Sequence, residues 1–124
     1  MAYIASSPET HKGEAVGTGQ CVAFVQKASG APLTSQWHRG IRVKGNGEQI
    51  EKGTAIATFD SNGVYGNHMD GTSHAAIYVG QEAEGIQVWD QWLGQPVHQR
   101  TLHFHGGAPD VKPVNDGDAF YVID

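Results

Sequence analysis

The sequence predicts an α+β domain in which one N-terminal helix packs on an antiparallel sheet of about five strands. An apolar stripe with helical spacing occurs near the N-terminus, and the later chain consists of short apolar runs separated by glycine-rich turns. The chain has 124 residues, no internal repeat and no linker that would divide it, so residues 1–124 are expected to form a single domain. Because the helix precedes the strands instead of alternating with them, we expect it to cover one face of the sheet.

The predicted helix lies in the stretch TGQCVAFVQKASG, residues 18–30. Thr18 is a possible N-cap, and Gly30 is placed to end the helix. Apolar residues recur at positions i, i+3, i+4 and i+7, the spacing that puts side chains on one helix face. These residues are Cys21, Phe24, Val25 and Ala28.

The sheet is predicted from the second half of the chain. Residues 31–53 are rich in Gly and Lys and are expected to be loop with at most one helical turn. The stretches that follow are short, contain β-branched or aromatic residues and are bounded by Gly, Pro, Asn or Asp, which is typical of strands. They are Thr54–Asp60, His74–Gly80, Gly85–Trp92, Pro96–His105 and Asp118–Asp124.

The composition excludes several classes of protein. With 39% hydrophobic and 17% charged residues, the chain is expected to fold. The net charge is -5 and the basic residues are scattered, so nucleic acid is not an expected partner. No apolar stretch approaches the ~20 residues of a membrane helix, and the N-terminus lacks the basic and apolar regions of a signal peptide. We therefore expect a protein that is made in the cytoplasm and does not insert into membranes.

Cys21 is the single cysteine, so its thiol is free, and it falls in the first turn of the predicted helix. The unpaired N–H groups and the positive end of the helix dipole there favour a thiolate, the form that attacks carbonyl groups. The Cys21 amide and the Gln20 side chain could also hold an oxyanion, and Gly19 would let the backbone approach a substrate. However, a free cysteine on an apolar helix face is also typical of core packing. Position alone leaves the catalytic and the structural interpretation open.

A catalytic thiol needs a general base, and His74 is the best placed of the seven histidines. It opens the predicted strand HAAIYVG, where a rigid sheet would fix its imidazole. His68 lies in a predicted loop and is a weaker candidate. His103 and His105 would share one strand face, but no further ligand pattern completes a metal site. We therefore predict neither a metal nor a cofactor.

The next predicted strand offers a residue to orient His74. The four residues QEAE separate the two strands, which predicts a hairpin that brings the start of the first beside the end of the second. His74 would face Asp90 in one register and Gln91 in the next. A carboxylate would hold the imidazole tautomer and stabilise the imidazolium, so Asp90 is the better chemical choice. Trp89 and Trp92 would then flank the site.

The stretches GQCVAFVQ, SHAAIYVG and VWDQW resemble the papain-like cysteine amidases of the NlpC/P60 and CHAP group. In that group a cysteine at a helix N-terminus precedes a strand histidine and a third polar residue on the next strand. The sequence is most similar to the type VI secretion amidase effectors, and the resemblance extends from Gly17 to about Asp124. It implies a papain-like fold with Cys21 as nucleophile, His74 as base and Asp90 as orienting residue.

The resemblance also implies a substrate, partners and a location. Members of this kind cleave peptidoglycan peptides, reach the periplasm of neighbouring bacteria through a secretion apparatus, and are blocked in the producing cell by an immunity protein. We expect a monomer that acts on the D-alanyl-diaminopimelate crosslink. The γ-D-glutamyl-diaminopimelate bond is the alternative substrate, and a binding module with a structural Cys21 is the alternative function.

Overall fold

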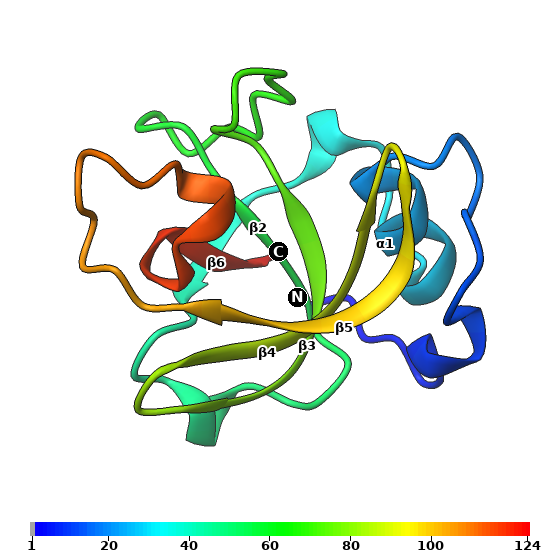
Figure 1. The fold of residues 1–124 in the computed structure, drawn as a ribbon, viewed down its shortest axis with the longest axis horizontal. Helices are drawn as coiled ribbons and strands as arrows, with labels where there is room; N and C mark the ends of the chain where they lie inside the picture. The colour runs from blue at the N-terminus through cyan, green and yellow to red at the C-terminus, as the bar shows by residue number, and fades with distance from the viewer. Residues whose placement is uncertain (1) are drawn as a thin grey trace.

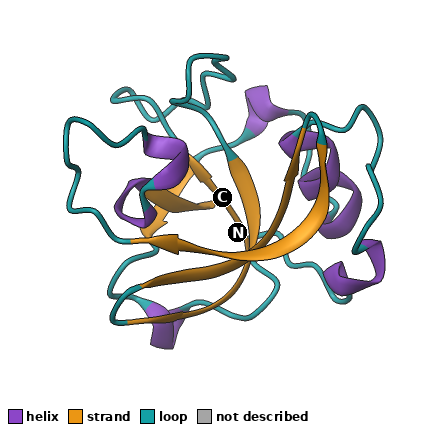
Figure 2. Ribbon diagram, in the orientation of Figure 1, coloured by secondary structure: helices purple, strands orange, loops and turns teal. Residues whose placement is uncertain are grey.

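The computed structural model describes residues 2–124 and shows one α-helix against a six-stranded antiparallel sheet (Figure 1). The strand order across the sheet is β1-β6-β2-β3-β4-β5. The predicted α+β class is confirmed. The main elements are α1 (Cys21–Ser29), β1 (Arg39–Arg42), β2 (Ala55–Thr58), β3 (Ala75–Glu82), β4 (Gly85–Trp92), β5 (Gln95–His103) and β6 (Phe120–Ile123). Short 3-10 helices lie in the connections (Figure 2): η1 (Pro8–His11), η2 (Thr34–Gln36), η3 (Gly47–Gln49), η4 (Pro113–Asn115) and η5 (Gly117–Ala119).

Helix α1 has the predicted apolar face and the predicted end. Phe24 and Val25 are fully buried against the sheet. Gly30 ends the helix in the left-handed conformation, with φ +76°, and its N–H donates to the Gln26 carbonyl. The predicted N-cap was wrong, because Gln20 and not Thr18 precedes the helix. Thr18 is instead part of a turn that starts at Val16, and this turn delays the helix start.

The sheet has six strands within residues 2–124, one more than the sequence predicts. The additional strand is β1, which lies in the segment expected to be loop. It is mostly exposed and forms an edge of the sheet, so its sequence RGIR carries no apolar alternation. Its partner is β6, with Arg39 opposite Ile123, and this pairing far along the chain creates the strand.

Two apolar clusters lie on opposite faces of the sheet. Helix α1 packs on the face that it shares with β3 and β4. Trp89 belongs to this helix side and does not flank the candidate site, because side chains alternate along β4 and Trp89 points away from the face of Asp90. The helix-side cluster includes Phe24, Val25, Trp37, Tyr65, Ile77 and Val97; the other includes Val43, Ile56, Tyr78, Val88, Leu102 and Phe120.

Strands β3 and β4 form the predicted hairpin, and an irregularity sets their register. Near the turn, Gly80 pairs with Gln87, whereas Ile77 pairs with Trp89. The register therefore shifts by one residue between Tyr78 and Gly80, as in a β-bulge. This shift decides which side chains at the far end of β4 share a face with His74.

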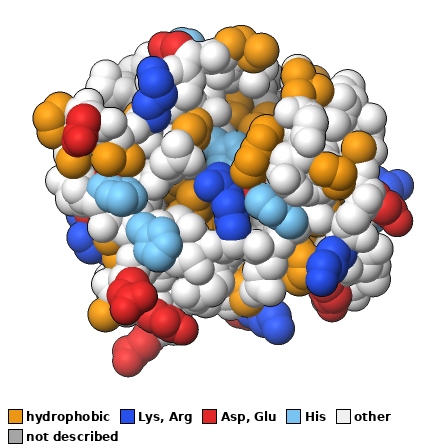
Figure 3. All heavy atoms as spheres, viewed as in Figure 1, with side chains coloured by type: hydrophobic (Ala, Val, Ile, Leu, Met, Phe, Trp, Pro, Cys, Tyr) orange, Lys and Arg blue, Asp and Glu red, His pale blue; other side chains and the backbone are white. Residues whose placement is uncertain are grey.

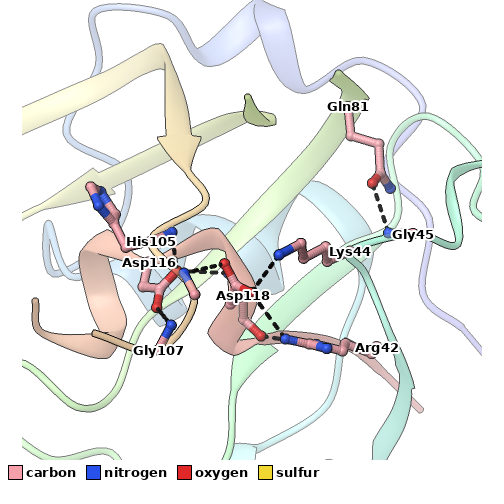
Figure 4. Close-up of polar contacts among 9 residues, drawn as sticks. Arg42, Lys44, Gly45, Gln81, His105, Gly107, Asp116 and Asp118 are labelled. Atoms are coloured by element: carbon pink, nitrogen blue, oxygen red, sulfur yellow. Dashed lines mark hydrogen bonds and ion pairs between the residues drawn. The ribbon is translucent and has the colours of Figure 1, made fainter. Parts of the chain in front are cut away.

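The loop after β5 is fastened by two buried carboxylates (Figure 4). Asp116 accepts hydrogen bonds from the backbone N–H groups of His105 and Gly107, and Asp118 accepts from that of Gly106. Asp118 also pairs with Lys44 at 2.7 Å and with Arg42 at 3.1 Å. Burial alone would raise the pKa of Asp118, but these hydrogen bonds and charges outweigh burial and lower it to about 2.

Asp118→Asn is expected to lower the free energy of unfolding at pH 7 by about 1–2 kcal/mol, since the cationic partners are partly screened by water. The folded-state pKa lies below the unfolded value of about 3.9, so this stabilisation is present above pH 4. It is lost as the pH falls from about 4 to about 2. Urea unfolding of the wild type and the variant across this range measures it, with the exposed carboxylate Asp110→Asn as control. An unchanged difference between wild type and Asp118→Asn at pH 2 would contradict the assignment.

Candidate active site

The nucleophile candidate, Cys21, is the first residue of α1 and is half-buried. The chain before it is held by Gln91, a fully buried residue of β4. Gln91 accepts from the Val16 N–H at 2.8 Å and donates to the carbonyls of Val16 at 2.9 Å and Gln20 at 2.8 Å. Gln91 thus fixes the backbone that carries Cys21 and points away from His74.

Gly19 and Gln20 complete the approach to Cys21. Gly19 has φ +86°, a conformation that favours glycine, and closes the turn with a bond from its N–H to the Val16 carbonyl. The site that a Gly19 side chain would occupy faces Leu93. Gln20 has an exposed side chain that lines the same cleft as Cys21. The substrate contact predicted for Gly19 and the oxyanion contact predicted for Gln20 stay predictions.

The base candidate, His74, directly precedes β3 and is fixed at its backbone and its ring. Its N–H donates to the Thr58 hydroxyl, and its carbonyl accepts from the Thr58 N–H, both at 3.0 Å. The ring Nε2 lies 2.7 Å from Asp90 Oδ2, and both side chains are buried. The strand predicted to begin at His74 begins one residue later, at Ala75. His74 is nevertheless held in place, because its backbone is bonded to Thr58, the last residue of β2.

The bulge in β3 explains why Asp90 and not Gln91 faces His74. Ile77 pairs with Trp89, and the same register extended toward the start of β3 places His74 opposite Trp92. His74 then shares a sheet face with Trp92 and Asp90. Had the pairing near the turn continued unshifted, the same face would hold Gln91. The structure therefore resolves the alternative that the sequence leaves open.

Cys21 and His74 shift each other's pKa in opposite directions. Burial by itself would raise the pKa of the Cys21 thiol, but its hydrogen bond with His74 and the charge of that residue lower it below the ordinary value. Burial by itself would lower the pKa of His74, but the bonds to Asp90 and Cys21 raise it to about 9. Since Nε2 faces Asp90, Nδ1 is the ring nitrogen left for Cys21. The site therefore favours a thiolate beside an imidazolium.

Tyr65 is a further neighbour of the thiol that the sequence reasoning missed. Its hydroxyl lies 3.8 Å from Cys21 Sγ, and its ring packs against Trp37. Burial, and then the charge of Cys21, raise the pKa of Tyr65 well above its usual range, so the hydroxyl keeps its proton and can donate to a thiolate. Tyr65 lies in the glycine-rich loop before β3, where no local pattern indicates a contact with α1.

His98 and Arg100 of β5 were also missed as neighbours of Asp90. Arg100 Nε donates to Asp90 Oδ2 at 2.8 Å. His98 Nε2 lies 3.0 Å from Asp90 Oδ1, close enough for an ion pair but not aligned for a hydrogen bond. Burial would raise the pKa of Asp90, but His74 and Arg100 lower it. The alternating spacing of His98 and Arg100 along β5 is the signal that could have placed them on the face of Asp90.

A cleft of about 510 Å³ opens over Cys21 and His74. Trp92 forms part of its wall and contacts the His74 ring edge to face, with ring centroids 6.3 Å apart. In Figure 1 the turn between β4 and β5 lies beside α1 at the upper right of the view, and β3 starts in the upper middle. Figure 3 shows basic and histidine side chains gathered around a hollow near the middle of the face that is drawn. The two candidate catalytic groups are thus open to a ligand from one side.

Metal ions in proteins are held by groupings of side chains such as those of His, Cys, Asp and Glu. Within residues 2–124, no three side chains of His, Cys, Asp or Glu are grouped to coordinate one. The His103 and His105 pair that was considered as half of a site is not on one strand, because β5 ends at His103. Among the same residues, no helix has the length and apolar character required to cross a bilayer.

Comparison with known proteins identifies the family. The model of the family described as domesticated amidase effector 2 matches residues 1–123. The chain belongs to this amidase effector family. A type VI secretion amidase effector 2 protein of Salmonella typhi is 35% identical over the whole of both chains. The domesticated amidase effector 2 of Ixodes scapularis is 40% identical over 85% of this chain and 70% of its own length.

A solved structure supports the amidase effector assignment. A chain described as type 6 secretion amidase effector 2 superimposes with a TM-score of 0.84 at 34% identity, over 98% of this chain and 94% of its own. The resemblance to the type VI secretion amidase effectors and the papain-like α+β fold are therefore confirmed. In this fold the helix that begins at Cys21 packs against the strand that follows His74.

Alkylation of Cys21 by iodoacetamide is expected in the folded amidase effector, with half-maximal rate at a pH below the 8.5 or so of free cysteine. The reason is that His74 stabilises the thiolate. Tyr65→Phe should move the midpoint upward by a few tenths of a pH unit, on the order of one weak hydrogen bond. Mass spectrometry of quenched samples between pH 5 and 10 measures the rate. A thiol that reacts only after unfolding would support the structural interpretation of Cys21 instead.

Proposed function

We propose that the chain is a cysteine amidase that hydrolyses amide bonds in the peptide stems of bacterial peptidoglycan. The observation that carries the proposal is that Cys21 and His74 line one open cleft and that His74 pairs with the buried Asp90 at 2.7 Å. Membership of the amidase effector family supports the choice of amide bonds. The names of the relatives do not state which chemical group attacks the amide, so the cysteine mechanism rests on the geometry.

The proposed reaction begins with the thiolate and the imidazolium already formed. Cys21 Sγ bonds to the carbonyl carbon, and the oxyanion is held by the Cys21 N–H and the Gln20 side chain. His74 gives its proton to the amine nitrogen as the carbon–nitrogen bond breaks, which leaves a thioester. Water then loses one proton to His74 and attacks the thioester, and the carbon–sulfur bond breaks, so that the thiolate and imidazolium re-form. The carboxylic acid product gives up its remaining proton to solvent as it leaves. Asp90 keeps the imidazole in position through both steps.

We infer that the bond cleaved is the D-alanyl-diaminopimelate crosslink, with the γ-D-glutamyl-diaminopimelate bond as alternative. Digestion of purified peptidoglycan followed by mass spectrometry of the fragments distinguishes the two. Crosslink cleavage converts dimers to monomers of unchanged stem length, whereas the alternative shortens the stems. Intact dimers and intact stems after prolonged digestion would contradict the proposed function.

We also infer that the chain acts as one domain and works as an antibacterial effector. The relative from Salmonella typhi is named a type VI secretion effector, which supports delivery into the periplasm of target bacteria. A producing cell would then need an immunity protein that covers the cleft. The test is periplasmic expression, which should lyse bacteria, whereas cytoplasmic expression should not. Equal toxicity from both compartments would contradict a peptidoglycan target.

A further inference from the structure

Arg100 is a charged side chain in the wall of the cleft. The side chains that line the cleft include no Asp, Glu or Lys among the residues that the structure describes, so Arg100 is the permanently charged group there. This cation lies in a chain whose net charge is -5. A cleft of this kind attracts an anionic group in an otherwise acidic protein.

The contacts of Arg100 fix one edge and one face of its guanidinium. Nε donates to Asp90 Oδ2, and the group stacks over the Trp92 ring at 4.9 Å from its centroid. The side chain is 22% exposed, so its remaining surface faces the cleft. These contacts hold the guanidinium in a defined orientation beside the reacting groups.

The two Nη groups at the outer edge of the guanidinium have N–H donors without close acceptors. Nη1 has one long contact, 3.5 Å, to Asn115 Oδ1. Nη2 lies 3.4 Å from His74 Nε2, but that nitrogen directs its own hydrogen to Asp90, so both atoms are donors and form no hydrogen bond. Arginine has no acceptor, and two Nη groups in one plane match the two oxygens of a carboxylate.

The position of Arg100 indicates which carboxylate would fit. His74 protonates the leaving amine in the proposed reaction, and Arg100 lies directly beside His74. In an α-amino acid the carboxylate and the amine are attached to the same carbon. The outer edge of Arg100 therefore suits the carboxylate of the residue that supplies the leaving amine.

We propose that Arg100 is the specificity residue that binds the free α-carboxylate on the leaving-amine side of the scissile bond. The inference rests on the proposed function and refines it. In the D-alanyl-diaminopimelate crosslink this carboxylate is free. In the γ-D-glutamyl-diaminopimelate bond the corresponding carboxyl is itself in amide linkage to the next residue of the stem. Arg100 thus favours the crosslink over the alternative bond.

The test uses two crosslinked muropeptide dimers that differ in one group: the α-carboxyl on the leaving side is either the free acid or the amide. The wild type is expected to prefer the acid by about 10- to 100-fold in kcat/KM, the size of a hydrogen-bonded charge pair. Arg100→Gln should bring this preference close to one, and Arg100→Lys should keep part of it. Arg42→Gln is the matched control, because Arg42 lies outside the cleft and Asp118 keeps Lys44 as a partner.

A role limited to positioning Asp90 would give a different result. Arg100→Gln would then reduce kcat for the acid and the amide by the same factor, and the preference for the acid would persist. That result would overturn the inference, as would a wild type that does not distinguish the two dimers. Arg100→Lys preserves the charge beside Asp90 but not the planar pair of donors. If Arg100→Gln fails to fold, the reduced preference of Arg100→Lys for the acid still tests the inference.

Binding measurements separate this inference from the proposed hydrolysis. Calorimetry with Cys21→Ala and the same two dimers should show tighter binding of the acid, and Cys21→Ala combined with Arg100→Gln should not. Selective binding without turnover by the wild type would reject the hydrolysis and retain the Arg100 assignment. Turnover without any selectivity in rate or binding would retain the hydrolysis and reject the Arg100 assignment.

Discussion

Cys21→Ala is expected to reduce peptidoglycan hydrolysis by about 10³-fold or more, because no thioester can form without the sulfur. His74→Ala should cause a similar loss, because the thiol then keeps its proton and the leaving amine receives none. Release of soluble muropeptides from purified peptidoglycan measures both effects. Circular dichroism and thermal unfolding verify that the variants fold.

The matched control for His74 is His38, an exposed histidine with backbone bonds to the chain end. His38→Ala should digest peptidoglycan at the wild-type rate. Turnover by Cys21→Ala at the wild-type rate would exclude Cys21 as the nucleophile. If His38→Ala also lost activity, the assay would be reporting lost folding and not lost chemistry.

Asp90→Asn is expected to lower kcat/KM at pH 7 by about 10²- to 10⁴-fold, since the amide keeps the shape of the side chain but not its charge. Without the carboxylate the imidazolium is less stable, so the pKa of His74 falls below its present value of about 9. The pKa of Cys21 rises for the same reason. Activity needs thiolate and imidazolium together, so the active pH range should become narrower from both sides. The pH dependence of kcat/KM measures this change.

A second histidine–carboxylate pair on the cleft rim provides the control. His68 lies 2.9 Å from Asp60, and both side chains are partly exposed. The interaction free energy of such an ion pair is small in water. Asp60→Asn should therefore leave both limbs of the pH profile in place. An Asp90→Asn profile that is scaled down but not shifted would show that Asp90 contributes stability and not the ionic state of His74.

The local elements of the fold could be predicted because their signals are local. The apolar spacing of α1 and its end at Gly30 depend on residues within a few positions of each other. The β3–β4 hairpin follows from two apolar runs and a short polar turn. β1 could not be predicted, because an exposed edge strand has no apolar pattern and exists through its pairing with β6.

The candidate site shows the same division. Cys21, His74 and Asp90 were selected by residue type and by position at the ends of predicted elements. The choice between Asp90 and Gln91 depended on a one-residue register shift at Tyr78, and a bulge in the middle of a strand leaves no clear sequence signal. The structure then assigns Gln91 a separate task, which is to hold the backbone before Cys21.

The sequence by itself determined the class of fold, the nucleophile and base candidates and the family resemblance, because each depends on short patterns of spacing and residue type. Only the tertiary structure decided how the charges around the thiol are arranged. Tyr65 lies in a loop distant in the chain from Cys21, and His98 and Arg100 lie on β5, the strand that pairs with β4. Each reaches Cys21 or Asp90 through strand register and packing. Hydrogen bonds and charge interactions act over a few ångströms, so these contacts arise only after the sheet has brought the segments together.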